Sequence, residues 1–278
     1  MKRIVTIQDI SCVGKCSLTV VLPIISAMGI ETAVIPTAVL STHTAFKNFT
    51  YRDLTCDLPK IANHWKQEKF NFDGIYTGYL GSIKQIDILK EFFKQFKTSN
   101  NFIFIDPVMA DNGKLYTGFD TNFVKEMKKL CKMADIIVPN LTEASYILEK
   151  ECKENYSEQE IKDMLVELSN LGPKYVVLTG VSFNNNKLGV MSYNKETNEF
   201  FTYFKEKVPA KYHGTGDIFA STLFGAVTNN NTLEEGLKIA VDYVWETISN
   251  TYKINKRDVY GVNFESQIPY LINRIRKN

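Results

Sequence analysis

The chain has 278 residues, 44% of them hydrophobic and 23% charged, and its formal net charge is only +2 at pH 7. That apolar content suffices for a large buried core, and so small a charge excess argues against a nucleic-acid-binding protein. Five cysteines without a C-x-x-C pair, no apolar leader and no apolar run of membrane-spanning length favour a cytoplasmic protein that acts away from membranes.

Short apolar runs alternate with longer amphipathic segments over the first two thirds of the chain. Runs such as FIFID and YVVLTG are typical of parallel strands buried on both faces. We predict strands at Arg3–Gln8, Ala33–Ala38, Gly74–Thr77, Phe102–Asp106, Ile136–Pro139 and Tyr175–Thr179. Between them we predict helices near Leu18–Met28, Leu58–Glu68, Lys84–Lys97, Asn122–Met133, Thr142–Glu149 and Glu158–Leu171. This alternation predicts an α/β fold with a doubly wound, mostly parallel sheet flanked by helices.

The pattern changes after Gly180. Two alternating runs, Leu188–Tyr193 and Phe200–Phe204, are joined by KETNE and indicate an antiparallel hairpin at a sheet edge. Helices are then expected to start at Gly214, Leu233 and Phe264. The sequence has no Pro/Gly/Ser-rich linker and no internal repeat, so we expect residues 1–278 to form a single domain.

Polar residues follow the predicted strands of this sheet. In open α/β sheets, ligands bind at the carboxyl ends of the strands. The residues that follow the strands include Asp9, Ser11, His43, Thr44, Tyr79, Asp106, Asp111, Asn140, Glu143, Thr179 and Gly180. We therefore expect the functional site at this edge of the sheet.

The segment His213-Gly214-Thr215-Gly216-Asp217 runs directly into a predicted helix. Its two glycines allow successive backbone N–H groups to face one point, and the positive end of the helix dipole adds to their effect, so the segment suits a phosphate. Asp217, in the first helical turn, is placed to accept a proton from an attacking hydroxyl, and the dipole should keep it ionised. The alternative is that Asp217 only caps the helix and the glycines only form a tight turn.

Three carboxylates, Asp106, Asp111 and Glu143, follow adjacent predicted strands. Such a group suits Mg²⁺ held through water. Glu143 also has a structural interpretation, because Asn140 or Thr142 can cap the following helix and an acidic residue stabilises its first turn. The P-loop, G-x-G-x-x-G and G-x-S-x-G motifs are all missing or incomplete, which leaves an NAD-dependent oxidoreductase or a serine hydrolase without support.

Several segments together resemble the pyridoxal/pyridoxamine kinase family of the ribokinase-like superfamily, from Ile4 to about Ile248. The GTGD element marks the superfamily. DPVMADNGKLY and PNLTEA resemble the branch that phosphorylates B6 vitamers and the thiamin-precursor pyrimidine, and STHT with TGYLGS favours B6. The other segments that resemble this family are QDISCVGKCSLTVVLPIISAMGIET, PTAVLSTHTAF, LTG and HGTGDIFAS.

The resemblance implies a role for each matching position. Asp217 becomes the catalytic base, and the backbone of Gly214, Thr215 and Gly216 becomes the anion hole. The residues at the substrate ring would be Asp9, Ser11, His43, Thr44 and Tyr79. The ATP side would comprise Asp106, Asp111, Asn140, Glu143, Thr179, Gly180 and Thr215, with Asp106 and Glu143 at Mg²⁺.

The same resemblance implies phosphorylation of the 5′-hydroxymethyl group of a small molecule, namely pyridoxal, pyridoxamine or pyridoxine, with ATP as co-substrate. It further implies Mg²⁺, a possible K⁺ requirement, a homodimer, and a flap over ATP at Phe204–Lys211. Two alternatives remain open, namely a hydroxymethylpyrimidine (phosphate) kinase of thiamin synthesis and a non-catalytic B6- or nucleotide-binding protein.

Overall fold

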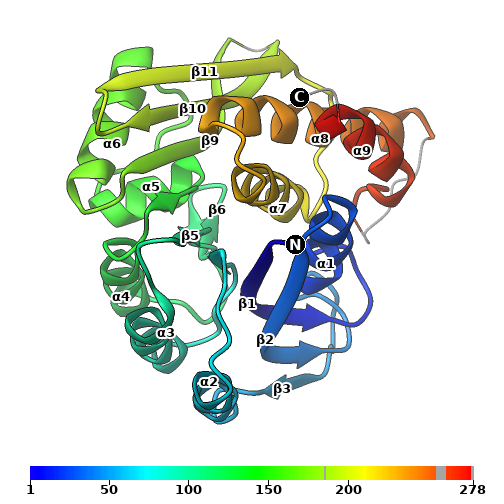
Figure 1. The fold of residues 1–278 in the computed structure, drawn as a ribbon. Coiled ribbons are helices and arrows are strands. Elements are labelled where there is room, and N and C mark those ends of the chain that lie inside the picture. Colours follow the sequence, from blue (N-terminus) through cyan, green and yellow to red (C-terminus); the bar gives the residue numbers. More distant parts are fainter. Residues whose placement is uncertain (185, 255–260, 277–278) are drawn as a thin grey trace.

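In the computed structural model, which describes residues 1–184, 186–254 and 261–276, nine strands form one sheet in the order β11-β10-β9-β8-β5-β4-β1-β2-β3 (Figure 1). The strands are β1 Arg3–Ser11, β2 Glu31–Leu40, β3 Tyr51–Asp53, β4 Gly74–Thr77, β5 Phe102–Ile105, β8 Ile136–Ile137, β9 Tyr175–Asn184, β10 Lys187–Asn194 and β11 Glu199–Glu206. A separate two-stranded ribbon joins β6, Ala110–Asp111, to β7, Lys114–Leu115.

The six central strands are parallel, and the strands at both edges run antiparallel. Parallel pairing connects β9, β8, β5, β4, β1 and β2, while β10, β11 and β3 pair antiparallel. The strand β1 pairs with β2 on one side and with β4 on the other. Chain direction across the sheet therefore reverses next to β1, where doubly wound sheets open a crevice for ligands.

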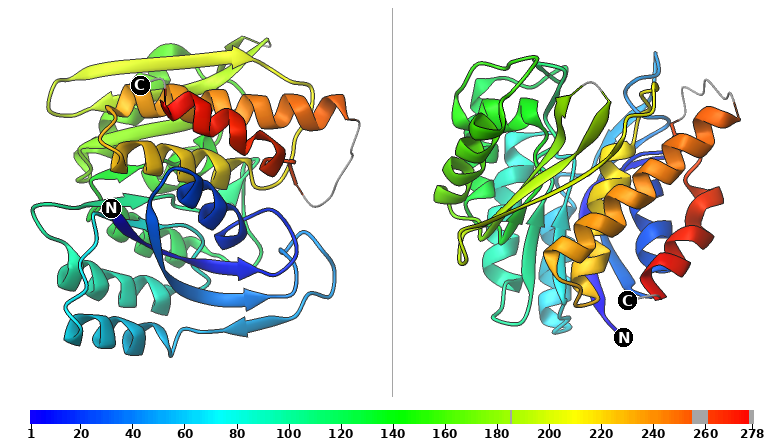
Figure 2. Two further views of the ribbon diagram at one scale, coloured as in Figure 1. Left: turned by 45° about the vertical axis from the view of Figure 1, so that its right-hand side comes forward. Right: turned by 90° about the horizontal axis from the view of Figure 1, so that it is seen from above.

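Two layers of helices cover the sheet (Figure 2). The layer on one face consists of α2 Leu58–Gln67, α3 Ile83–Phe96, α4 Thr121–Cys131, α5 Leu141–Leu148 and α6 Glu158–Asn170. The other layer consists of α1 Leu18–Ala27, α7 Thr215–Thr228, α8 Leu233–Lys253, the short 3₁₀ helix η1 Glu265–Gln267 and α9 Ile268–Arg276. Each face has its own apolar core, so the central strands are buried on both sides. No helix within the described ranges combines the length and the apolar character that crossing a membrane requires.

The predicted fold class is confirmed, and the differences concern short strands. The strand predicted at Ile136–Pro139 is regular only at Ile136–Ile137, because Pro139 has no amide to donate, and an isolated bridge between Asn140 and Thr179 follows. Conversely, β9 continues to Asn184. The sequence prediction missed β3 and the β6–β7 ribbon, because strands of two or three residues are too short to show an alternating pattern, and β3 is exposed throughout.

Candidate active site

The turn before α7 is built around one glycine. Gly214 is the N-cap of α7 with a φ of 79°, and a Cβ at this position would collide with the backbone oxygen of Lys15. Only glycine combines this left-handed conformation with so close an approach. Thr215, Gly216 and Asp217 follow in the first turn of α7, where backbone N–H groups have no partner inside the helix. The turn therefore presents amide donors and a carboxylate from one short segment.

A cavity of about 400 Å³ lies beside this turn. Its polar wall contains Asp106, Asp111, Asn140, Glu143, Thr179, Gly180, His213, Gly214, Thr215, Gly216 and Asp217. The end of β5, the middle of β9 at Thr179 and Gly180, and the N-termini of α5 and α7 thus meet around one space. Every residue expected on the ATP side from the sequence borders it. A volume of this size suits a small organic ligand.

The apolar wall of the cavity was not predicted as part of the site. It includes Val241, Val244, Trp245 and Ile248, all from α8. The indole Nε1 of Trp245 also donates a hydrogen bond to the backbone oxygen of Glu206 at 2.8 Å. The spacing of three and four residues along α8 is the pattern of any helix face that packs on a core. Only the tertiary structure reveals that this face borders a cavity.

Glu143 is fixed by backbone amides rather than by a cation. It forms a capping box with Asn140, in which each side chain accepts from the other residue's N–H at 2.9 Å. Its second oxygen accepts from the N–H of Met109 at 3.1 Å. The Asn140 amide group also donates to the backbone oxygen of Ala110 at 2.8 Å. The capping interpretation is confirmed, and it leaves Glu143 on the cavity wall.

Burial makes the carboxyls of Asp106 and Glu143 weaker acids. It raises the pKa of Glu143 to about 8, although the amides of Asn140 and Met109 oppose the shift. Burial, with the charges of Glu143 and Asp217, raises the pKa of Asp106 well above its usual range. No Lys or Arg among the described residues forms an ion pair with Asp106, Glu143 or Asp217. These three carboxyls therefore have no cationic side chain paired with them in the described chain, and a bound cation could supply that positive charge.

Asp217 differs from the expectation that the helix dipole keeps its pKa low. Burial raises the pKa of Asp217 to about 6, the N–H of Ser17 opposes this rise, and the charge of Asp9 adds to it. The Ser17 amide donates to Oδ2 of Asp217 at 3.0 Å. Desolvation thus outweighs the hydrogen bond from Ser17, and the carboxyl is a stronger base than an exposed aspartate.

The residues expected at the substrate ring lie outside the lining of this cavity. Asp9 and Ser11 are buried at the end of β1, where the Ser11 hydroxyl donates to Oδ2 of Asp9 at 3.3 Å. Tyr79 follows β4, and burial together with the charges of Tyr51 and Asp9 raises the pKa of Tyr79 to about 12. The structure therefore brings Asp9, Ser11 and Tyr79 into one neighbourhood that Asp217 also shares.

The two other expected ring residues, His43 and Thr44, lie in the loop after β2. The ring of His43 is buried, and its centroid is 5.4 Å from that of His213, which precedes the glycine-rich turn. Thr44 is exposed. His43 thus reaches the glycine-rich turn before α7, whereas Thr44 lies on the surface.

The expected flap, Phe204–Lys211, comprises the end of β11 and the loop after it. Lys205, Glu206, Lys207, Val208 and Ala210 line the cavity. At the far end, the Nζ of Lys211 donates to the side-chain oxygen of Asn112 at 3.3 Å, in the turn between β6 and β7. The segment therefore passes along the cavity and contacts the turn between β6 and β7.

Ser17 is a site residue that the sequence interpretation missed. Besides its amide contact with Asp217, its hydroxyl donates to Oδ1 of Asp9 at 2.6 Å. Because Ser17 directly precedes α1, its sequence context indicates an ordinary helix N-cap. The structure shows no capping bond from its side chain. Nothing local in the sequence signals the partner 200 positions away.

The substitution Asp217→Asn should make the protein more stable at pH 7–8. The folded-state pKa of about 6 exceeds the ordinary 3.8, so the carboxyl favours the folded state at low pH and loses that contribution as pH rises through about 6. Asparagine avoids burying the charge, and we expect a melting temperature a few degrees above wild type near pH 8, with the difference shrinking toward pH 4. Thermal melts across this range measure it.

Asp53→Asn is the matched control with the opposite sign. The hydroxyl and amide of Thr55 lower the pKa of Asp53, so this carboxylate stabilises the fold at neutral pH and loses the contribution on acidification. Its variant should melt below wild type near pH 8. If Asp217→Asn melts at or below the wild-type temperature near pH 8, desolvation does not raise the pKa of Asp217 as described.

Comparison with known proteins gives one family and several close structural relatives. The family described as phosphomethylpyrimidine kinase matches residues 24–262. A Bacteroides thetaiotaomicron protein assigned to the phosphomethylpyrimidine kinases, crystallised in a form with pyridoxal, is 40% identical; the match covers 97% of this chain and 95% of that one, with a TM-score of 0.93.

Two named pyridoxal kinases also match over most of the chain. The enzyme from Lactobacillus plantarum is 28% identical with a TM-score of 0.90, covering 98% of this chain and 97% of that one. Pyridoxal kinase of Arabidopsis thaliana is 27% identical over 93% of this chain and 85% of its own length. Since both the family match and a 40% identical relative span most of its length, the chain belongs to the phosphomethylpyrimidine kinase family, whose ribokinase-like fold it shares with pyridoxal kinases.

Proposed function

We propose that this chain transfers the γ-phosphate of ATP to the 5′-hydroxymethyl group of a vitamin B6 vitamer, which is pyridoxal, pyridoxamine or pyridoxine. The observation that carries the proposal is the position of Asp217. It stands in the amide-rich turn of α7, on the wall of the large cavity and within electrostatic reach of Asp9. The 40% identical relative with pyridoxal and the L. plantarum pyridoxal kinase support the B6 substrate.

The large cavity suits the nucleotide because its two walls differ. Apolar side chains of α8, among them Val241 and Val244, offer a surface for a base, and the polar wall offers amides and hydroxyls for phosphates. We assign the phosphates to the turn at Gly214–Gly216, where free amides and the dipole of α7 favour negative charge. Asp106, Asp111, Asn140, Thr179 and Gly180 complete that side.

Asp217 serves as the general base in this mechanism. With a pKa of about 6 it is mostly ionised at pH 7, yet it accepts a proton more readily than an exposed aspartate. Its carboxylate takes the proton of the hydroxymethyl group as the oxygen approaches the γ-phosphate. The amides of Thr215 and Gly216 stabilise the negative charge on the transferring group.

The cavity wall fits a divalent cation that is held partly by the nucleotide. Asp106 and Glu143 are buried carboxylates without an ion-pair partner in the described chain, and no cluster of three or more His, Cys, Asp or Glu there forms a complete metal site. Mg²⁺ commonly uses one or two carboxylates and completes its shell with water and phosphate oxygens. Bound there, Mg²⁺ would neutralise phosphate charge. Both oxygens of Glu143 already accept from amides, whereas within the described residues no hydrogen bond occupies the carboxylate of Asp106.

The alcohol is assigned to the neighbourhood of Asp9, Ser11 and Tyr79, with His43 beside it and Thr44 on the loop above. The runner-up substrate is hydroxymethylpyrimidine, favoured by the description of the family that matches residues 24–262. Both alcohols would use the same base and the same phosphate site. We also propose that residues 1–278 act as one kinase domain, and a cytoplasmic homodimer that uses K⁺ remains a prediction.

Turnover with separate acceptors tests the function. We expect ADP release from Mg-ATP in the presence of K⁺ when pyridoxal, pyridoxamine or pyridoxine is added, well above a blank without acceptor. Hydroxymethylpyrimidine should give a lower kcat/KM. Turnover with hydroxymethylpyrimidine alone would keep the mechanism and change the substrate. ATP binding without turnover on any acceptor would instead indicate a binding protein.

Replacing the base should abolish most of the chemistry. We expect Asp217→Asn to lower kcat by on the order of 10²–10⁴ while ATP affinity stays near wild type, because the amide cannot take a proton. Asp120→Asn is the matched control, since Asp120 is the exposed N-cap of α4 and asparagine caps equally well. Near-normal kcat in the Asp217 variant would remove Asp217 from the mechanism.

Asp106→Asn should weaken the response to magnesium. We expect the Mg²⁺ concentration for half-maximal rate to rise roughly tenfold or more, in the range seen when the surroundings of a bound metal lose a partner. Titration of the rate with Mg²⁺ after removal of metal by a chelator measures this, with Asp120→Asn again as control. An unchanged Mg²⁺ requirement would exclude Asp106 from the cation site.

A further inference from the structure

Ser17 has a backbone conformation that its residue type does not favour. Its φ is 51° and its ψ is −136°, a region that glycine occupies readily and other residues avoid. The residue is also buried, with 6% of its surface exposed. Non-glycine residues persist in such conformations where the surrounding structure holds them.

The contacts of Ser17 join two carboxylates. Its N–H donates to Asp217 at 3.0 Å, and its hydroxyl donates to Asp9 at 2.6 Å. The second distance is typical of a charge-assisted hydrogen bond from a hydroxyl to a carboxylate. One residue therefore touches both the proposed base and the buried carboxylate of the alcohol subsite.

Helix capping does not account for the side chain. A serine in this position usually accepts a hydrogen bond from an amide of the first helical turn. Ser17 makes no such bond, and only its backbone oxygen accepts from Val20 and Val21, at 2.9 and 3.0 Å. Its hydroxyl donates to Asp9 instead, so the position of Ser17 at the start of α1 does not explain this contact.

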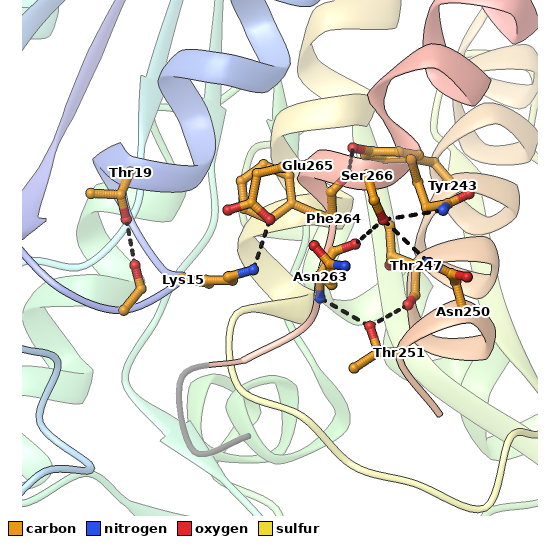
Figure 3. Close-up of polar contacts among 12 residues, drawn as sticks. Lys15, Thr19, Tyr243, Thr247, Asn250, Thr251, Asn263, Phe264, Glu265 and Ser266 are labelled. Carbon is orange, nitrogen blue, oxygen red and sulfur yellow. Dashed lines mark hydrogen bonds and ion pairs between the residues drawn. The ribbon is translucent and has the colours of Figure 1, made fainter. Parts of the chain in front are cut away.

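The loop that carries Ser17 contacts the C-terminal part of the chain through Lys15 (Figure 3). The Nζ of Lys15 forms an ion pair of 2.7 Å with Glu265, and it lies 5.8 Å from the centre of the Phe264 ring. The hydroxyl of Thr19 donates to the backbone oxygens of Gly14 and Cys16. These contacts fix the path of the loop around Ser17.

The C-terminal segment is in turn fastened to α8. Tyr243 donates its hydroxyl to the backbone oxygen of Phe264 at 2.9 Å, and Thr251 accepts from the N–H of Asn263 at 2.9 Å (Figure 3). Through Lys15, the loop before α1 is therefore tied to the same helix that forms the apolar wall of the cavity. Ser17 has little freedom to turn its N–H away from Asp217.

We propose that Ser17 is a positioning residue, whose amide orients the base Asp217 and whose hydroxyl orients Asp9 toward the ring of the alcohol. This inference rests on the proposed function. An ionised carboxylate only accepts hydrogen bonds, and those from Ser17 and Ser11 leave acceptor positions of Asp9 unused. Asp9 thus selects alcohols whose aromatic ring presents an N–H or O–H donor.

Ser17→Ala isolates the hydroxyl, because it keeps the backbone N–H. We expect KM for the alcohol to rise about tenfold to a hundredfold, as for the loss of a hydrogen bond to a charged group, while kcat and the KM for ATP stay within about threefold. Asp9→Asn should raise the same KM. The double variant Ser17→Ala/Asp9→Asn should then add little to either single change.

Two further variants separate positioning from structural support. Thr19→Val removes a hydroxyl from the same loop that contacts only backbone oxygens, and it should lower the melting temperature without raising the alcohol KM. Ser17→Gly relieves the backbone strain, so it should melt above Ser17→Ala yet show the same raised alcohol KM. This opposition between stability and affinity would not arise from a purely structural serine.

The outcomes distinguish this inference from the proposed function. If the wild type turns over B6 vitamers and Ser17→Ala leaves the alcohol KM unchanged, or if Thr19→Val raises it equally, the role of Ser17 is wrong and the function stands. If the wild type turns over no alcohol, the function is wrong. Calorimetric binding of pyridoxal to wild type and Ser17→Ala then decides the positioning role, with equal affinities overturning it.

Discussion

The site is organised by the burial of carboxylates without cations. Asp9, Asp106 and Glu143 are buried and Asp217 is partly buried at the carboxyl edge of the sheet, and no Lys or Arg in the described ranges pairs with any of them. Burying an unpaired charge is costly, so each group needs hydrogen-bond donors, a proton or a ligand. Backbone amides and the hydroxyl of Ser17 supply the donors. These donors offset only part of the desolvation, so the pKa values of Asp106, Glu143 and Asp217 remain raised. A site built this way is prepared for cations and for groups that donate.

The same constraint explains why strained backbone occurs here. Gly214 takes a left-handed conformation close to the backbone oxygen of Lys15, and Ser17 has a positive φ of 51° although it is not glycine. A residue held in such a region costs on the order of 1–3 kcal/mol. Two hydrogen bonds from Ser17 to the carboxylates of Asp9 and Asp217 compensate for this strain. Among the described residues, the N–H of Ser17 is the donor that satisfies the carboxylate of Asp217. The strained backbone of Ser17 thus lowers the stability of the fold at the residue that links the proposed base, Asp217, to Asp9 of the alcohol subsite.

Much of the architecture could be predicted from local patterns. Continuous apolar runs identified the buried parallel strands, and the rule that ligands bind at their carboxyl ends brought Asp106, Asn140 and Glu143 to one cavity wall. The two glycines before Asp217 identified the turn of α7. These inferences succeeded because strand burial, chain direction and glycine geometry are encoded within a few neighbouring residues. The wall formed by α8 could not be found, since its spacing matches any core-facing helix.

Ser17 shows where local inference fails and why that failure is informative. Its position before α1 indicates a cap, its residue type disfavours a positive φ, and its partner Asp217 is 200 residues away. Asp217 likewise departs from the low pKa that its place in α7 suggests, because burial and the charge of Asp9 raise that pKa. Consistency between local preference and tertiary structure is the rule in folded proteins, and exceptions concentrate where function sets the geometry. Here two exceptions contact one another, which argues that the Asp9–Ser17–Asp217 arrangement is held for chemistry rather than for the stability of the fold.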